Sequence, residues 1–224
     1  NNGFAAPVES VVESFSLPGK GEIDPSGIMA GFYYVLFGLM LSDAGYGFLM
    51  ALACGIALTV FKNMEIGLRK ALNMFFFCGL STIFWGVMFG SYFGDVVTVV
   101  STTFFHNPVN VPALWFVPVN EPMRLLLYSF IIGILHLFTG LGIQGYQLWK
   151  AKRYKDAVYD VGFWFLLLIS LVVFALCSDM VPKILQIPFV LPEPAGTISG
   201  AGAICGAVGI ILTSGRESRN PFKR

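Results

Sequence analysis

Three ionisable side chains lie inside or at the edge of apolar sequence, where a charge is costly and a functional role is the default hypothesis. His136 is at the centre of the apolar stretch 124–149, where a neutral imidazole could relay a proton or simply bond to a neighbouring helix. Asp43 and Asp95 could line a polar vestibule on one face. Asp43 could instead cap a helix, and Asp95 could be a solvated carboxylate at a helix end. Asp43, Asp95 and His136 are therefore ion-pathway candidates.

Other kinds of chemistry find little support in the sequence. It contains no GxxxxGK[ST], GxSxG or HExxH pattern, so we expect no catalytic site. With two histidines and no cysteine pair at ligand spacing, we expect no structural metal and no cofactor. The net charge of +1 argues against a nucleic-acid partner. The four cysteines are far apart within or beside apolar runs, as small core residues are: Cys54, Cys78, Cys177 and Cys205.

The composition predicts a membrane protein. Of the 224 residues, 56% are hydrophobic and only 12% are charged, and the mean hydropathy is +0.74. Such values exclude an ordinary water-soluble domain. A bilayer crossing needs about 20 apolar residues, so the length allows five or six crossings. We expect an all-α, polytopic transmembrane helix bundle in contact with lipid.

The distribution of Lys and Arg predicts the topology. Three connectors, Lys62–Lys70, Lys150–Lys155 and Arg216–Arg224, hold eleven of the 14 basic residues, which places them in the cytoplasm. We expect a cytoplasmic lead-in at 1–24 and a cytoplasmic connector at 214–224, as in a piece of a longer polypeptide. The six predicted spans are 25–42, 44–61, 71–94, 124–149, 159–177 and 196–213.

The first apolar stretch, Pro25–Phe61, is too long for one straight crossing. As a single helix it would measure about 55 Å, against a hydrocarbon core of about 30 Å. Either it is one strongly tilted helix with its N-terminus outside, or it is a hairpin that turns at Ser42–Gly47. A carboxylate at the hairpin apex would reach water. We favour the hairpin, which gives six spans and two cytoplasmic termini.

Small residues indicate close helix packing. Gly86, Gly90 and Gly94 recur every fourth residue, as Gly202 and Gly206 do, so we expect each set to line one helix face. Glycines at the predicted turn would permit a close backbone approach. The predicted packing positions are Gly45, Gly47, Gly86, Gly90, Gly94, Gly202 and Gly206.

Polar residues before prolines mark two predicted helix starts, at Asp24-Pro25 and at Asn120-Glu121-Pro122. At the second start, Glu121 and Arg124 are expected to form an interfacial pair in which the arginine stem snorkels toward the membrane surface.

Four sequence runs resemble a known family. They are IDPSGIMAGFYY at 23–34, FGLMLSDAGYG at 37–47, GVMFGSYFGD at 86–95 and GRESRNP at 215–221. Together they resemble the front part of the membrane domain of the stator subunit (subunit a, also called I) of V/A-type rotary ATPases. The resemblance extends from about residue 20 to the C-terminal residue.

The resemblance implies a membrane domain of eight helices that follows a large cytoplasmic region. In that family, two half-channels carry H⁺ or Na⁺ to and from a rotating ring of c-type subunits, and an essential arginine on the seventh helix faces the ring. The resemblance places that helix beyond this sequence, so the chain by itself is expected to be non-catalytic. Asp43 would help to shape the external half-channel. The implied partners are the c-type ring, peripheral-stalk subunits and the central-stalk ring adaptor.

The short connectors favour a prokaryotic plasma membrane. Two rival interpretations stay open, an independent ion channel or secondary transporter and a purely structural membrane scaffold. A transporter often shows paired interrupted helices in repeated halves. This sequence shows one interrupted segment, which weakens the transporter interpretation.

Overall fold

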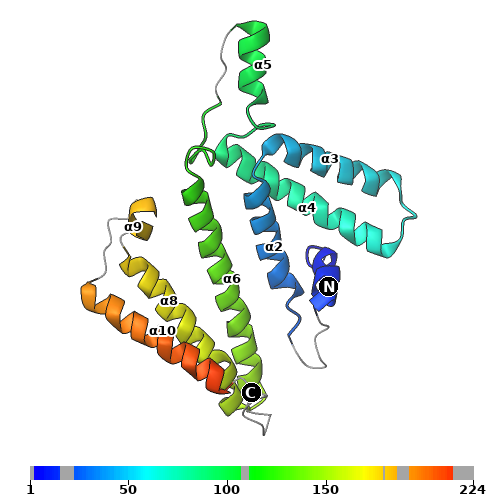
Figure 1. The fold of residues 1–224 in the computed structure, drawn as a ribbon. Helices are drawn as coiled ribbons and strands as arrows, with labels where there is room; N and C mark the ends of the chain where they lie inside the picture. The colour runs from blue at the N-terminus through cyan, green and yellow to red at the C-terminus, as the bar shows by residue number, and fades with distance from the viewer. Residues whose placement is uncertain (1–2, 16–22, 107–110, 179, 186–191, 214–224) are drawn as a thin grey trace. The chain divides into compact units, whose positions relative to one another are not determined.

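The computed structural model describes residues 3–15, 23–106, 111–178, 180–185 and 192–213, and within these ranges all regular structure is helical (Figure 1). The predicted all-α class is therefore confirmed for the described residues. The longer helices are α2 (Ser26–Leu41), α3 (Ala44–Val60), α4 (Ile66–Phe89), α5 (Val96–Phe105), α6 (Pro122–Lys150), α8 (Phe163–Cys177) and α10 (Glu193–Thr213). The short ones are η1 (Ala6–Val8), α1 (Glu9–Phe15), α7 (Tyr154–Asp156), the π-helical η2 (Ala157–Gly162) and α9 (Met180–Leu185).

Four helical stretches in the described residues are long and apolar enough to cross a membrane: Ile66–Phe89, Pro122–Lys150, Tyr154–Cys177 and Pro194–Thr213. The predicted spans 25–42 and 44–61 correspond to α2 and α3, which have only 16 and 17 residues. Their crossing of the bilayer, the count of six spans and the side on which each terminus lies stay predictions. The predicted connector 214–224 lies outside the described residues.

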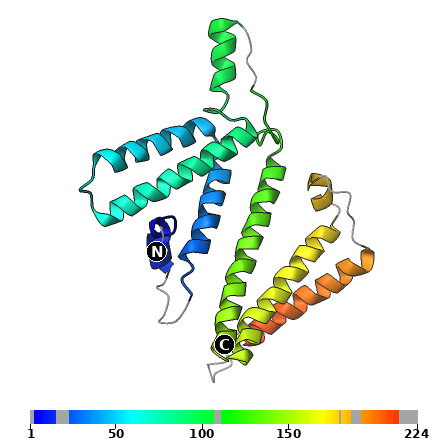
Figure 2. The same ribbon diagram turned by 180° about the vertical axis from the view of Figure 1, so that it is seen from behind.

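The chain divides into two compact units, residues 1–132 and 133–224. In the first unit, α4 is the central helix. Figures 1 and 2 show α4 running back along α3 from the turn at 61–65, and α2 also packs against α4. The chain turns between α2 and α3 at residues 42 and 43, and the formation of a hairpin of two spans stays a prediction.

The N-terminal lead-in is packed against helices in its described part, whereas the sequence predicts that it is solvated. Val8 is fully buried in a core cluster with Tyr34 of α2. The Tyr34 hydroxyl donates to the carbonyl of Phe4 over 3.0 Å, and Lys70 of α4 donates to Glu9. Although this segment contains many polar residues, its apolar residues recur every fourth position, which places their side chains on one face.

The predicted span 71–94 is wrong at its C-terminal end. The helix α4 ends at Phe89, and Gly90 caps it with φ +70°, donating to the carbonyls of Gly86 and Val87. Gly94 has φ +68°. Both lie in the left-handed region, where glycine terminates a helix without strain. Gly90 and Gly94 therefore do not continue the face on which Gly86 lies.

In the second unit, α10 packs against α8 through its glycines. A Cβ atom on Gly202 would lie 2.5 Å from the Ser170 hydroxyl, and one on Gly206 would lie 3.0 Å from the amide nitrogen of Leu167. The first distance is shorter than carbon contacts allow and the second is tighter than most of them, so the two helices approach closely because these residues lack side chains. The predicted span 159–177 starts within the π-helical η2.

Candidate functional site

Asp43 occupies the corner between α2 and α3. Ser42 ends α2 with φ +39°, and Asp43 returns to extended backbone with φ −132°. One carboxylate oxygen, Oδ1, accepts hydrogen bonds from the amides of Gly45 at 2.9 Å and Tyr46 at 3.1 Å. Asp43 thus caps α3, which satisfies two amides that have no partner within the helix.

The same carboxylate also binds the loop that follows α4. Phe93 donates its amide to Oδ1 over 2.9 Å. The Ser91 hydroxyl and the Gly94 amide each donate to Oδ2 over 2.7 Å. In return, the Ala44 amide donates to the Ser91 carbonyl over 2.9 Å. We call Asp43 with residues 91–94 the Asp43 cradle. With the amides of Gly45 and Tyr46 included, five donors from two segments about 50 residues apart bind this one side chain.

Glycines let the two segments approach. The Phe93 ring occupies the space that a Cβ atom on Gly45 would need. A Cβ atom on Gly86 would overlap the amide nitrogen of Ala44. The Tyr46 ring meets the Phe93 ring edge-on, with centroids 5.3 Å apart, and Phe93 itself has φ +56°. A non-glycine residue is costly in that region, so the cradle holds the loop in a strained conformation.

The Asp43 side chain is charged and almost fully enclosed, with 6% of its surface exposed. Burial by itself raises the pKa of the carboxyl, but hydrogen bonds from Gly94, Ser91, Tyr46 and Phe93 outweigh it and hold the pKa below its ordinary value of 3.8. The carboxylate therefore stays ionised at neutral pH. This arrangement suits a group that ties segments together, and the role of Asp43 in an ion pathway stays a prediction.

The other two ion-pathway candidates are placed differently. Asp95 is exposed and directly precedes α5, without a capping hydrogen bond from its side chain. The expectation that it ends a helix is wrong, because α4 stops at Phe89 and Gly90. His136 is half-buried on α6, in the second unit. The proposed ion-pathway roles of Asp95 and His136 stay predictions.

Comparison with known proteins finds similar curated proteins, although no family model matches the sequence. The A-type ATP synthase subunit I of Thermococcus kodakarensis is 29% identical over 216 residues, which cover 96% of this chain and 31% of that protein. The same subunit of Pyrococcus horikoshii is 29% identical, over 80% of this chain and 26% of that protein. The V-type ATP synthase subunit I of Borreliella burgdorferi is 25% identical, over 75% and 27%.

Over most of its length, this chain is similar to subunit I of A- and V-type ATP synthases. It spans no more than about a third of the length of these curated relatives. The alignment with the Thermococcus kodakarensis subunit I covers nearly all of this chain, so both units described above belong to the shared region.

The first unit also contains an aromatic cluster beside the C-terminal end of α4. Trp115 donates its amide to the Met88 carbonyl over 3.0 Å. Arg124 Nη1 pairs with Glu121 at 3.0 Å, and its guanidinium lies 5.1 Å from the centroid of the Phe116 ring. The cluster consists of Trp85, Phe89, Trp115, Phe116 and Tyr128. The location of the Glu121–Arg124 pair at a membrane interface stays a prediction.

Sequence reasoning missed two parts of this region. It did not find Ser91, Phe93 and Gly94 as partners of Asp43, because the glycine spacing favoured a continuous helix. It also treated α5 as part of a connector, although its Val- and Thr-rich sequence forms a ten-residue helix. The glycines at 90 and 94 were the available signal, since glycine also marks helix ends.

Proposed function

We propose that this chain is part of the membrane domain of a rotary ATPase stator and supports H⁺ or Na⁺ translocation beside a ring of c-type subunits. The observation that carries the proposal is the alignment with subunit I of A-type ATP synthases over 96% of the chain. The four apolar helical stretches support membrane insertion.

The proposed contribution of this part is mechanical stiffness. A stator must resist the torque that the rotor exerts, so its helices must not slide. Close backbone contact between α3 and α4 supports this role, because a Cβ atom on Gly47 would lie 2.7 Å from the Ile83 nitrogen. The Asp43 cradle adds a second attachment between the α2–α3 corner and the loop after α4. We propose that Asp43 acts structurally.

We further propose that the ring-facing arginine is not among the described residues of this chain. Arg124 pairs with Glu121 at the start of α6. Arg153 pairs with Asp156 in the turn after α6, over 2.7 Å. Arg69 is exposed in the first turn of α4. All three lie at helix ends, where water or lipid head groups can solvate them, and none is set deep in a helix as the proposed mechanism requires.

Copurification tests the proposed partners. Full-length protein that carries this segment should be recovered with a small ring-forming subunit that has a membrane-embedded carboxylate, with peripheral-stalk subunits and with a central-stalk ring adaptor. A full-length variant that lacks this segment is the matched control and should lose the ring. Recovery of the protein alone, with ion transport activity of its own, would favour the channel or transporter interpretation.

The proposed topology is tested by thiol labelling. In a chain with Cys177 and Cys205 changed to serine, Asp95→Cys should react with a membrane-impermeant maleimide from outside, because Asp95 is exposed next to the cradle. Asn63→Cys, in the exposed turn between α3 and α4, should react only from the cytoplasmic side. Reaction of both positions from the same side would contradict a membrane crossing by α4, and with it the six spans.

A further inference from the structure

A cavity of about 520 Å³ lies in the second unit, lined by residues of α6, η2, α8 and α10. Its volume falls within the range of about 300–1,000 Å³ that is typical of small-molecule sites. A bare ion needs far less space, so the cavity is suited to an organic ligand.

Contacts between the helices place their ends at one level beside this cavity. The contacts of α10 with α8 run antiparallel, and the last of them places the Phe163 ring where a Cβ atom on Gly209 would lie. One turn further along α10, Thr213 is level with η2. On α6, a Cβ atom on Gly145 would lie 3.4 Å from the side chain of Val161 in η2. The C-terminal ends of α6 and α10 therefore lie beside η2.

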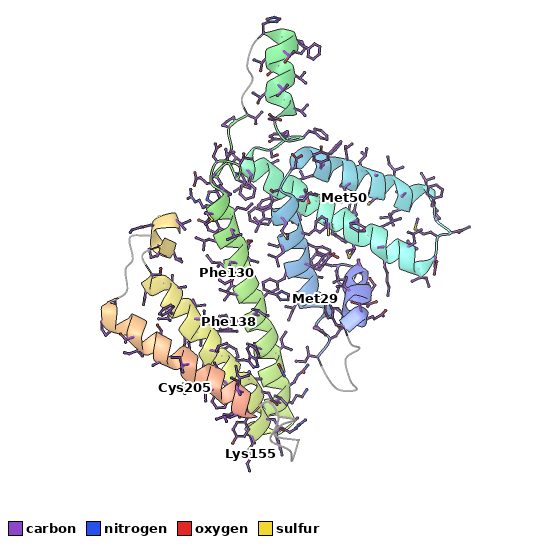
Figure 3. The ribbon with its side chains drawn as sticks, in the orientation of Figure 1. Met29, Met50, Phe130, Phe138, Lys155 and Cys205 are labelled. Carbon is purple, nitrogen blue, oxygen red and sulfur yellow. The ribbon has the colours of Figure 1, made fainter. Side chains whose placement is uncertain are left out.

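The lining changes from polar to apolar in the same direction on every helix. Figure 3 labels Lys155 at the end where α6, α8 and α10 converge. The lining residues nearest this end are polar, namely Gln144, Tyr159, Asp160 and Thr213. The lining residues deeper along the helices are mainly apolar, among them Leu137, Leu168 and Ile210. Such a gradient fits an amphiphile whose head group lies near the helix ends and whose alkyl chain points inward.

Asp160 gives the polar end a negative charge. Among the described residues that line the cavity, it is the one charged side chain. It is half-buried and belongs to the π-helical η2, and π-helical turns are rare and frequently lie at functional sites. Tyr159 and Trp164 line the same cavity, and the faces of aromatic rings attract cations. The polar end therefore favours a cationic head group over an anionic one.

We propose that this cavity binds a membrane lipid with a primary ammonium head group, such as phosphatidylethanolamine. The Asp160 carboxylate pairs with the ammonium, because its two oxygens can accept about four hydrogen bonds and so serve a ligand as well as the protein. The Gln144 carbonyl and the Thr213 oxygen accept the remaining N–H groups. The Thr213 hydroxyl donates to the Gly209 carbonyl over 2.7 Å, which leaves its oxygen as an acceptor. Exposed lysines of the adjoining 150–155 connector match the negative phosphate of such a lipid.

Native mass spectrometry tests the proposal. Full-length protein that carries this segment is released from micelles with equal amounts of phosphatidylethanolamine, phosphatidylcholine and phosphatidylglycerol that have the same acyl chains. We expect phosphatidylethanolamine to be retained at least about 10-fold over phosphatidylglycerol, the scale for one hydrogen bond to a charged group. Phosphatidylcholine should be retained less than phosphatidylethanolamine, because its quaternary ammonium has no N–H group. Equal retention of the three lipids would overturn the proposal.

The variant Asp160→Asn removes the charge and keeps the shape of the side chain. It should lower the retention of phosphatidylethanolamine at least about 10-fold, whereas retention of phosphatidylglycerol should stay the same or rise. Asp156→Asn is the matched control. It makes the same change one turn earlier, at a carboxylate that pairs with Arg153 and is not part of the cavity lining, and it should leave the retention of all three lipids unchanged.

A second pair of variants tests the aromatic part of the site. Trp164→Leu should weaken retention of phosphatidylethanolamine about 2- to 5-fold, the scale of a cation–π contact at an exposed site. Trp149→Leu, exposed at the end of α6 and outside the cavity lining, should have no effect. Unchanged retention in Asp160→Asn, or an equal loss in Asp156→Asn, would overturn the proposal. So would an equal loss of all three lipids in Asp160→Asn, because the site would then not recognise the ammonium group.

Discussion

The variant Asp43→Ala is expected to lose roughly 3–5 kcal/mol of unfolding free energy, the scale for breaking a buried charged network. It removes an acceptor that serves five donors, among them the amides of Gly45, Phe93 and Gly94. The buried amide of Gly45 and the partly buried amides of Phe93 and Gly94 would then lose their acceptor. Denaturant unfolding in detergent micelles, followed by circular dichroism, measures the loss.

Asp95→Ala is the matched control for Asp43→Ala. It removes a carboxylate from the same loop, but this side chain is exposed and does not cap α5. A change within about 0.5 kcal/mol is expected, as for most surface substitutions. Equal losses for the two variants would show that the cradle does not stabilise the protein.

The lowered pKa of Asp43 gives a second measurement on the same side chain. Because the folded pKa lies below the ordinary value of 3.8, the stabilisation is fully present above that value and is lost as the pH falls through the folded pKa. The parent chain should therefore lose stability in this acidic range. Asp43→Asn should lack this acid-dependent loss of stability. Identical profiles of stability against pH for the parent and the variant would contradict the lowered pKa of Asp43.

The second large effect is expected for Gly86→Ala. The added Cβ atom would overlap backbone atoms of Asp43 and Ala44, which cannot rotate away as a side chain can. The helices must separate or the corner must shift, at a cost of about 1–3 kcal/mol or more, as for an overpacked core. The shift would also disturb the Asp43 cradle, so the losses in Asp43→Ala and Gly86→Ala should not add.

Gly140→Ala makes the same change on α6, at a helical glycine with open space around its Cα atom. Because alanine favours helix over glycine by up to about 1 kcal/mol, this control should be neutral or stabilising. Thermal unfolding of both variants in one detergent gives the comparison. A Gly86→Ala protein as stable as the parent would contradict the close contact between α4 and the corner that joins α2 to α3.

Hydropathy and charge predicted the positions of the long helices because an apolar stretch between basic connectors leaves few alternatives. The predicted helix boundaries were less accurate where the conformation of a single residue determines the end of the helix. The end of α4 depends on whether Gly90 adopts a left-handed conformation, and a glycine every fourth residue fits both a helix face and a cap. The segment around Val8 was misjudged for another reason, since its burial depends on contacts with α2 and α4.

Only those contacts of Asp43 that lie close to it in the sequence could be predicted. Asp43 before a glycine-containing helix start is a local capping pattern, and the cap is present. Its bonds to Ser91 and Gly94 join residues 48 and 51 positions apart, and no local pattern encodes such a distance.

The Asp43 cradle also determines how a pulling force would travel along the polypeptide. Tension between α2 and α5 would pass directly from Asp43 to residues 91–94 through three hydrogen bonds that are loaded together. The α3–α4 hairpin between these points would bear no load until the hydrogen bonds between Asp43 and residues 91–94 break. A force-extension trace should then show one abrupt rupture, followed by the release of about fifty residues of hidden length.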